Sequence, residues 1–355
     1  MKVALLSPAD WPEARRGGER YARELGAGLL ARGHAPRLIT AHAGPFVRLV
    51  DDGLPIVRHW RPPDGRLRRR LFEDYLTHVP FSYLSLRRGH DDVAVALYPT
   101  DALAAVRWSD RSGRPAVFCY LGIPHREGLA NRRGRVAIMQ RAVRGSAAVV
   151  ALSEVARQGF ERWLGIEARV IHPPVDIDRF VPAERSSHPT IICPVDATEP
   201  RKRVPLLLEA FGLVRRERPA ARLVLSAPVP GPTGDGVEVR DLDDTGALAG
   251  AYAESWVCAL PSWGEAFGLV LAEALACGTP VVGSDRGAAP EIIDGREIGR
   301  VFSGDEPRAL STALLEALEL AELPGIKEAC RARGHDFSRD RCIDAHLALF
   351  AELGA

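Results

Sequence analysis

Short, continuous apolar runs alternate with amphipathic segments along most of the chain, and this pattern constrains the fold more than any other feature. Apolar runs without polar alternation are typical of parallel strands buried on both faces, and the segments between them have the periodicity of helices. We therefore expect an α/β protein with parallel sheets. The strands expected in the first half are VALLSP, PRLITAH, VAVALYP, PAVFCYL, AAVVALS and ARVIHPPV.

The pattern pauses at FVPAERSSHPT, residues 180–190, which contains Pro and Ser and has no periodicity, and then restarts. A chain of 355 residues is too long for one comfortable core, so two domains are expected. We place the first domain at residues 1–183 and the start of the second at residue 184. The strands expected in the second half are TIICPV, ARLVLSAP, VEVRDL, WVCALPS and TPVVGSD.

Composition excludes several classes of function. The formal net charge of +1 provides no global field toward nucleic acid, so none is expected as a partner. The six cysteines form no C-x-x-C pair, which favours reduced core residues in a cytoplasmic protein over disulfides or a zinc site. The first apolar run is too short for a signal peptide or a membrane span.

Ligands of open α/β folds bind at the carboxyl ends of the strands, so function is expected in the loops there. In the first such loop, Gly17 and Gly18 precede a helix, where the missing side chains would let a ligand approach backbone amides. A flexible turn is the alternative interpretation. The G-x-G-x-x-G spacing of a dinucleotide site is absent, which argues against an NAD enzyme.

Two glutamates stand in the stretch GEAFGLVLAEALACGTPVV, residues 264–282. If a helix begins near Phe267, the neighbours of Glu273 one turn away are apolar, so its carboxylate is expected to face inward and to need a polar partner. On a continuous helix, Glu265 and Glu273 would lie about 12 Å apart along the axis. That distance exceeds the roughly 5 to 9.5 Å between the carboxyls of a glycosidase.

The two carboxylates are instead expected to contact different parts of one long ligand. A nucleotide sugar has that length, with Glu265 near the sugar and Glu273 bonded to the ribose diol. The intervening diphosphate would suit the amides at the helix start. Those amides belong to Ala266, Phe267, Gly268 and Leu269.

The segment PSWGEAFGLVLAEALACGTPVVGSDRGAAPEII resembles the donor-site signature of the family-4 retaining glycosyltransferases. The resemblance continues, in order, through most of the chain. It implies the GT-B fold, two facing Rossmann-like domains with the second ending at residue 335 and a closing helix in residues 336–355 that crosses back to the first. The other matching segments are GGERYARELGAGLLARGH, VVALSEVARQGF, VIHPPVDIDRFVP, EPRKRVPLLLEAF and DFSRDRCIDAHLALFAEL.

The resemblance also implies roles for individual residues. Glu265 would hold hydroxyls of the transferred sugar, and Lys202 with Arg201 would stabilise the leaving diphosphate. Gly17 and Gly18 would give the diphosphate or the acceptor room. The acceptor would attack the face that the nucleotide leaves, and neither a metal ion nor a cofactor besides the nucleotide-sugar donor would be needed.

The chain departs from the family pattern at three places. Val195-Asp196 replaces a common Gly-Arg pair, and Arg201 or Arg203 could supply the missing phosphate contact. A frequent His is replaced by Leu121, with His125 four residues later as a candidate for the site. HPPVD replaces an asparagine-glycine turn, which is expected to alter a loop more than the chemistry.

Plainer interpretations stay open for the three main residues. Glu265 could be a carboxylate favoured by a helix start, and Glu273 could face solvent. Lys202 could be a surface lysine, although only three of the 47 basic residues are lysines.

The acceptor is expected to be a small molecule, such as a specialised metabolite of a bacterium with a GC-rich genome. Arginine-rich stretches at 65–76 and 131–145 could dock on an anionic membrane, but a solvated face is favoured because neither shows a continuous apolar side. A lipid or polysaccharide acceptor is one alternative. The others are a sugar phosphorylase or epimerase, and a non-catalytic partner that binds nucleotide sugars.

Overall fold

The computed structural model describes residues 1–10, 17–61, 75–132, 134–229 and 234–355. The chain forms two compact units. Unit 1 comprises Met1–Pro174 and Arg339–Ala355, and unit 2 comprises Val175–Ser338. The boundaries expected from the sequence lie after residues 183 and 335, so the observed units divide nine residues earlier and three residues later. Val175 belongs to unit 2 because its amide donates to the Phe337 carbonyl at 3.0 Å and it forms a bridge with Ser338.

An eight-stranded sheet in the order β3-β4-β2-β1-β5-β6-β7-β8 forms the centre of the described part of unit 1. All neighbouring strands are parallel except β3 and β4, which form an antiparallel hairpin at one edge. The hairpin was not expected from the apolar runs. The strands are β1 (Lys2–Leu6), β2 (Ala35–His42), β3 (Val47–Asp51), β4 (Leu54–Trp60), β5 (Val93–Ala96), β6 (Ala116–Tyr120), β7 (Ala148–Ala151) and β8 (Arg169–Val170).

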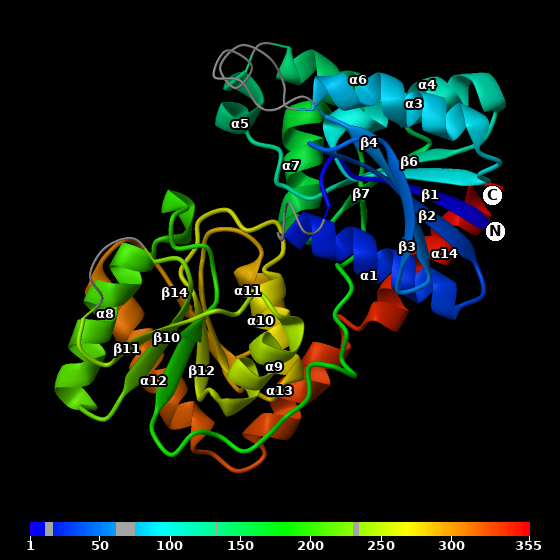
Figure 1. The fold of residues 1–355 in the computed structure, drawn as a ribbon. Helices are drawn as coiled ribbons and strands as arrows, with labels where there is room; N and C mark the ends of the chain where they lie inside the picture. Colours follow the sequence, from blue (N-terminus) through cyan, green and yellow to red (C-terminus); the bar gives the residue numbers. More distant parts are fainter. Residues whose placement is uncertain (11–16, 62–74, 133, 230–233) are drawn as a thin grey trace. The chain divides into compact units, whose positions relative to one another are not determined.

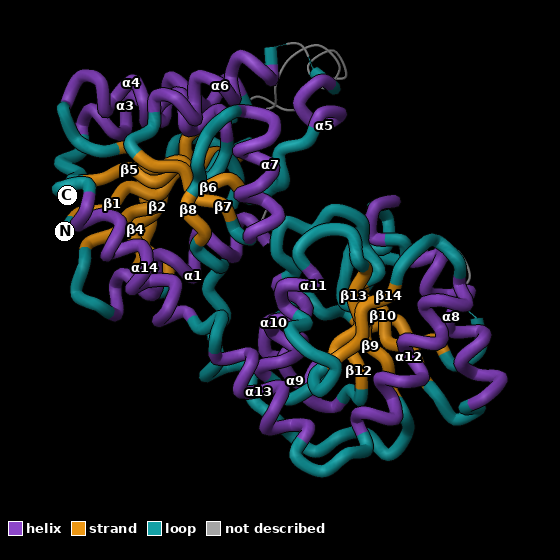
Figure 2. The backbone as a smooth tube through the Cα atoms, turned by 180° about the vertical axis from the view of Figure 1, so that it is seen from behind, coloured by secondary structure: helices purple, strands orange, loops and turns teal. Residues whose placement is uncertain are grey.

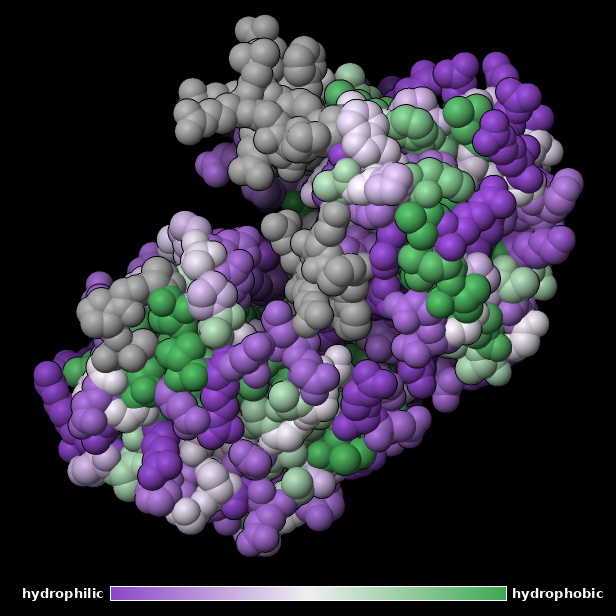
Figure 3. All heavy atoms as spheres, viewed as in Figure 1, coloured by the Kyte–Doolittle hydropathy of each residue, from purple (hydrophilic) through white to green (hydrophobic). Residues whose placement is uncertain are grey.

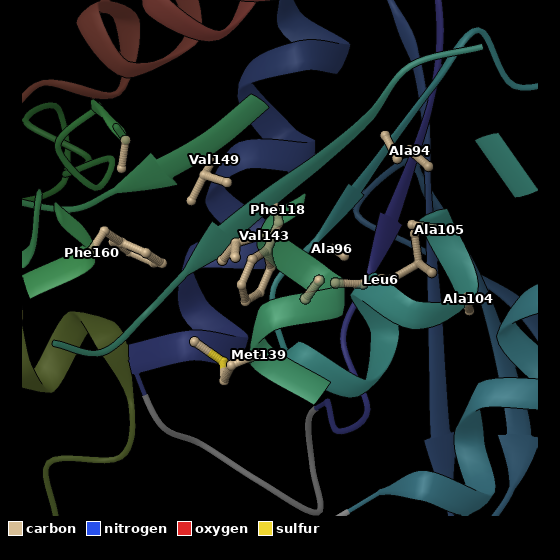
Figure 4. Close-up of a cluster of buried hydrophobic side chains, with 14 of the residues drawn as sticks. Leu6, Ala94, Ala96, Ala104, Ala105, Phe118, Met139, Val143, Val149 and Phe160 are labelled. Carbon is tan, nitrogen blue, oxygen red and sulfur yellow. The ribbon is translucent and has the colours of Figure 1, made fainter. Parts of the chain in front are cut away.

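Helices cover both faces of this sheet, with α3, α4 and α6 on one side and α1 and α14 on the other (Figures 1 and 2). Buried apolar side chains fill the space beneath α4 and α6, where Val143 lies beside Phe118 (Figure 4). The helical elements are α1 (Gly17–Ala31), η1 (Leu76–His78), α3 (Val79–Arg88), α4 (Pro99–Ser112), α5 (Arg126–Ala130), α6 (Arg135–Gly145), α7 (Glu154–Leu164) and α14 (Arg339–Glu352).

The closing helix α14 packs on α1, as the resemblance implied (Figures 1 and 2). The Nδ1 of His346 lies 2.9 Å from the Cys342 carbonyl, which can only accept, so Nδ1 carries the proton. The Nε2 therefore accepts from the Tyr21 hydroxyl of α1, 3.2 Å away. Burial lowers the pKa of His346 to about 4, so the ring is neutral at pH 7.

A six-stranded, fully parallel sheet in the order β11-β10-β9-β12-β13-β14 forms the core of the described part of unit 2. Helices α8 and α12 lie on one face, and α9, α10 and α13 on the other (Figures 1 and 2). The strands are β9 (Thr190–Cys193), β10 (Arg222–Ser226), β11 (Val237–Arg240), β12 (Val257–Leu260), β13 (Val281–Ser284) and β14 (Gly299–Phe302). The helical elements are η2 (Pro200–Lys202), α8 (Val204–Glu217), α9 (Thr245–Glu254), α10 (Leu269–Ala276), α11 (Ala289–Ile292), α12 (Pro307–Ala321) and α13 (Ile326–His335).

All six cysteines are buried and unpaired, as their positions in apolar runs predicted. Hydrophilic side chains predominate on the face of the molecule shown in Figure 3, and hydrophobic ones form separate groups there. Within the described ranges, no helix is long and apolar enough to cross a bilayer.

Candidate functional site

Two neighbouring strands of unit 2 carry the residues that the sequence analysis singled out. β9 leads into η2 and the start of α8, and β12 leads into a loop, residues 261–268, that ends at α10. β9 and β12 are parallel partners, so both loops emerge at the same edge of the sheet. A ligand site is therefore expected at this edge of the sheet.

Three predicted residues meet there. The Lys202 ammonium donates to Oε1 of Glu265 at 2.6 Å, and Nη1 of Arg201 donates to the same oxygen at 3.1 Å. Arg201 also donates to Glu199 at 2.6 Å. The side chains of Lys202 and Glu265 are each only 14% exposed, whereas that of Arg201 is 44% exposed. Residues more than 60 positions apart thus form one partly buried charge cluster.

The backbone holds this cluster in place. The Trp263 amide donates to the Arg201 carbonyl at 2.9 Å, which ties the two loops together. The Ala288 amide donates to the Glu265 carbonyl at 2.9 Å. Gly287 lies against this contact with φ of 109°, and a Cβ there would lie 2.7 Å from the Glu265 nitrogen, so only glycine fits. The position of Glu265 is therefore set by two other loops.

The electrostatics of the cluster favour an ionised carboxylate. Burial alone would raise the pKa of Glu265, but the charges of Lys202 and Arg201 outweigh it, and the pKa lies below its usual value. Burial would lower the pKa of Arg201, yet Glu265 and Glu199 raise it. At neutral pH the two cations of the cluster are thus paired with two carboxylates, Glu265 and the more exposed Glu199.

The start of α10 adds backbone donors. The helix begins at Leu269, two residues later than expected, after Gly268 in a left-handed conformation. Among the described residues, the amides of Ala266, Gly268 and Leu269 have no hydrogen-bond acceptor. A helix N-terminus with free amides suits an anion. Because Glu265 precedes the helix, the premise that both glutamates lie on one continuous helix is wrong.

Glu273 faces inward, as predicted, and is only 1% exposed. Its Oε2 accepts a hydrogen bond from the Tyr252 hydroxyl of α9 at 3.1 Å. Tyr252 is a protein partner that the sequence analysis did not consider, so the burial of Glu273 does not by itself require a ligand. Its contact with a ribose stays a prediction.

Arg203 lies beside Lys202 in the chain, but its side chain points to different partners. Its guanidinium donates to the carbonyls of Pro261 and Gly304 and to Asp305. The structure thus places Arg203 away from the Glu265 carboxylate. Asp196, at the departure from the family pattern, is exposed and accepts from the amide of Thr198, where it caps its own loop.

The remaining predicted residues lie in unit 1. Gly17 and Gly18 begin α1, and a Cβ on Gly18 would lie 3.0 Å from the side chain of Leu121 and 3.5 Å from the Tyr98 hydroxyl. His125 is exposed and occupies the N-cap position of α5 without a side-chain capping hydrogen bond, and its Nδ1 lies 3.0 Å from the carbonyl of Ile123 in its own loop. The structure therefore brings Leu121, and not His125, to Gly18.

Of the two arginine-rich stretches, only the second lies mostly within the described residues. Most of the first, residues 65–74, lies outside the described residues. The second includes α6, where Val136 is exposed at 42%. In the described ranges, no group of three or more His, Cys, Asp or Glu side chains is arranged to hold a metal ion.

Trp263 and Tyr252 were missed by the sequence analysis. Trp263 is 42% exposed, two residues before Glu265, which is unusual for a large apolar side chain. A tryptophan in the loop that follows the apolar run WVCALPS is the sequence signal that could have identified it. Tyr252 shows no such signal, because its contact with Glu273 forms only through the packing of α9 on α10.

Two family models match the chain. Residues 16–174 match the "Glycosyl transferase 4-like domain", and residues 188–320 match "Glycosyl transferases group 1". Among curated relatives, the D-inositol 3-phosphate glycosyltransferase of Gordonia bronchialis is 32% identical over 51% of the chain and 46% of the relative. The phosphatidyl-myo-inositol mannosyltransferase of Mycobacterium tuberculosis is 30% identical over 48% of each. The chain spans about half the length of the curated relatives it matches.

Solved structures match nearly the whole chain. The sucrose-phosphate synthase of Thermosynechococcus elongatus has a TM-score of 0.83 at 20% identity, covering 99% of this chain and 98% of the other. HepE from Anabaena, in complex with UDP and glucose, has a TM-score of 0.74 at 15% identity, covering 99% and 100%. At these identities the likeness shows the fold alone.

Proposed function

Because the chain belongs to the family-4 glycosyltransferases of the GT-B fold, we propose that it transfers a sugar from a nucleoside-diphosphate donor to an acceptor hydroxyl. We further propose that the transfer retains the anomeric configuration and needs no metal ion. The observation that carries the proposal is the contact of Lys202 and Arg201 with Glu265 at the edge of the unit 2 sheet.

The geometry supports a division of labour at this site. Lys202 and Arg201 would pair with the diphosphate and stabilise the charge that develops as it leaves. The free amides at the start of α10 would add donors to the same anion. Once Lys202 and Arg201 bind the phosphate groups, Glu265 would accept hydrogen bonds from hydroxyls of the transferred sugar. No described cluster suited to a metal ion takes part in these roles.

For the acceptor we propose a small hydroxylated molecule. The names of two relatives indicate inositol phosphate and phosphatidylinositol as the first compounds to test. Membrane docking requires a continuous apolar face with aromatic or leucine anchors. Within α6, all of whose residues are described, Val136 is the one exposed large hydrophobic residue, which favours a soluble acceptor.

The test is a transfer assay with the purified chain, UDP-, GDP- and ADP-sugars, and either soluble inositol phosphate or phosphatidylinositol vesicles. Release of nucleoside diphosphate and the anomeric configuration of the product by NMR are measured, with and without EDTA. Lys202→Met should abolish transfer, because it removes a cation from the leaving group. Lys327→Met is the matched control, since that lysine donates to the Ala183 carbonyl elsewhere in unit 2.

Each alternative gives a different result. Sugar 1-phosphate or an isomerised donor would indicate a phosphorylase or an epimerase, and donor binding without any turnover would indicate a non-catalytic partner. Inverted product or loss of activity in EDTA would overturn the mechanism, and transfer to vesicles alone would overturn the acceptor proposal.

A further inference from the structure

Arg203 adopts a backbone conformation that arginine rarely takes. Its φ of 55° lies in the left-handed region, which among the described non-glycine residues is shared only by Asp52 and Tyr75. The left-handed conformation costs a residue with a side chain about 1 to 2 kcal/mol, and glycine would avoid this cost. The side chain of Arg203 must therefore make contacts that offset it.

Those contacts join three loops at one edge of the sheet. The Arg203 side chain is only 5% exposed, and its guanidinium donates to the Pro261 carbonyl at 3.3 Å, the Gly304 carbonyl at 3.0 Å and Asp305 Oδ1 at 2.8 Å. Pro261 follows β12, and Gly304 and Asp305 follow β14. A planar fork with several donors can bind such separate acceptors at once, and a lysine ammonium on its flexible stem cannot hold them in one plane.

The aromatic ring of Trp263 strengthens the same connection. The Arg203 Cζ lies 4.9 Å from the centre of the Trp263 ring and 5.7 Å from that of Phe302. The Trp263 amide in turn donates to the carbonyl of Arg201. The 201–203 turn and the loop after β12 are thus joined twice, once through a backbone bond and once through this side chain.

The joined segments carry the charge cluster. Lys202 precedes Arg203 directly, and Glu265 lies four residues after Pro261. A shift of either loop would separate the Lys202 ammonium from the Glu265 carboxylate, which now lie 2.6 Å apart. Misplacement of a binding group by about 1 Å can cost about a hundredfold in rate.

We propose that Arg203 is a positioning residue, which holds Lys202 and Glu265 in the geometry that receives the diphosphate without contacting the ligand itself. This inference rests on the proposed function. It replaces the expectation that Arg203 binds phosphate directly, because its guanidinium binds protein acceptors and is almost fully buried. This role requires the left-handed backbone at Arg203, since the side chains of Lys202 and Arg203 must reach different partners.

The test compares Arg203→Gly and Arg203→Lys with the wild-type chain. Glycine accepts the left-handed backbone, so that variant removes only the side chain. Arg300→Lys is the matched control, because Arg300 is also mostly buried and donates to carbonyls in unit 2, but it joins β14 to Glu316 of α12. The Kd of UDP, GDP and ADP, the kcat and KM of transfer, and amide hydrogen exchange are measured.

Both Arg203 variants should raise the Kd of the preferred diphosphate and lower kcat by about 10- to 100-fold, while Arg300→Lys changes neither. Amides of residues 201–203 and 261–268 should exchange faster in the Arg203 variants alone. Wild-type exchange rates there, or an unchanged Kd in folded Arg203→Lys, would overturn the inference. If the wild-type chain binds no diphosphate, the proposed function is wrong. If the Arg203 variants then show only faster exchange, Arg203 stabilises the loops, and the proposed link to diphosphate binding is overturned.

Discussion

Glu265 pairs with the two cations that a diphosphate would need, and this pairing predicts how Glu265→Gln changes the binding of diphosphate. In the structure, one oxygen of Glu265 accepts from both Lys202 and Arg201. A diphosphate must share or displace that contact. Removing the negative charge while keeping the side-chain shape should therefore strengthen the binding of free nucleoside diphosphate, even though it removes a predicted contact with the sugar.

The size of the effect follows from the burial of the pair. Both side chains are 14% exposed, so their attraction is stronger than that of a surface ion pair but is still screened. Releasing the cations should be worth about 1 to 2 kcal/mol, or about 5- to 30-fold in the Kd of free diphosphate. The loss of hydrogen bonds from the sugar to a charged carboxylate should cost the intact donor about 1.5 to 3 kcal/mol. At the middle of both ranges the loss exceeds the gain, so the intact donor should bind the variant slightly less tightly than the wild type.

Calorimetric titration of the free diphosphate and of the intact donor into both proteins measures the two effects separately. Glu199→Gln is the control, because Glu199 pairs with Arg201 but does not contact Lys202. Both of these side chains are more than 40% exposed, so their pairing is weak, and Glu199→Gln should strengthen the binding of free diphosphate less than Glu265→Gln does. If Glu265→Gln weakens free diphosphate and intact donor by the same factor, Glu265 does not compete with phosphate, and the assignment of roles is refuted.

Three further predictions concern stability, each measured by urea or thermal unfolding. Tyr252→Phe removes a donor from the buried carboxylate on α10 and should cost about 1 to 3 kcal/mol; an unchanged midpoint would contradict this. Gly28→Ala places a Cβ 2.5 Å from Ile343 on α14 and should cost about 1 to 3 kcal/mol, whereas Gly212→Ala, with open space around it, should not destabilise. Burial lowers the pKa of His346 to about 4, so unfolding exposes a group that gains a proton between pH 6.5 and 4. Stability should therefore fall by up to about 3 kcal/mol as pH drops through this range, and His346→Gln should lose that dependence; an equal slope in both would refute it.

The parallel strands were predictable because burial on both faces requires continuous apolar runs in the sequence. β5 and β12 read as VAVA and VCAL and lie in sheet centres. The β3–β4 hairpin was missed, since VRLVD and LPIVRHW contain charged or polar residues and are only partly buried, unlike the continuous apolar runs of central strands. Its signal was the Asp52-Gly53 pair, whose positive φ angles of 49° and 79° suit a two-residue hairpin turn.

The glutamates of residues 264–282 and the family resemblance together predicted the acidic and basic members of the site, but the partners of these residues depend on long-range packing. The contact between Lys202 and Glu265 forms because β9 and β12 are neighbours in the sheet. The contact between Glu273 and Tyr252 forms because α9 packs on α10. A spacing of eight residues could not distinguish these cases, since one glutamate lies in a loop and the other in a buried helix.

The 201–203 turn shows why consecutive basic residues cannot be treated as substitutes for one another. Lys202 contacts Glu265, while Arg203 contacts Gly304, and Arg203 stands in the left-handed conformation between η2 and α8. Of the two arginines considered as replacements for the phosphate-binding arginine of relatives, Arg203 is committed to protein acceptors and Arg201 is the one that contacts Glu265. A phosphate contact in this turn is therefore expected from Arg201. The left-handed backbone at Arg203 accompanies the different direction of its side chain.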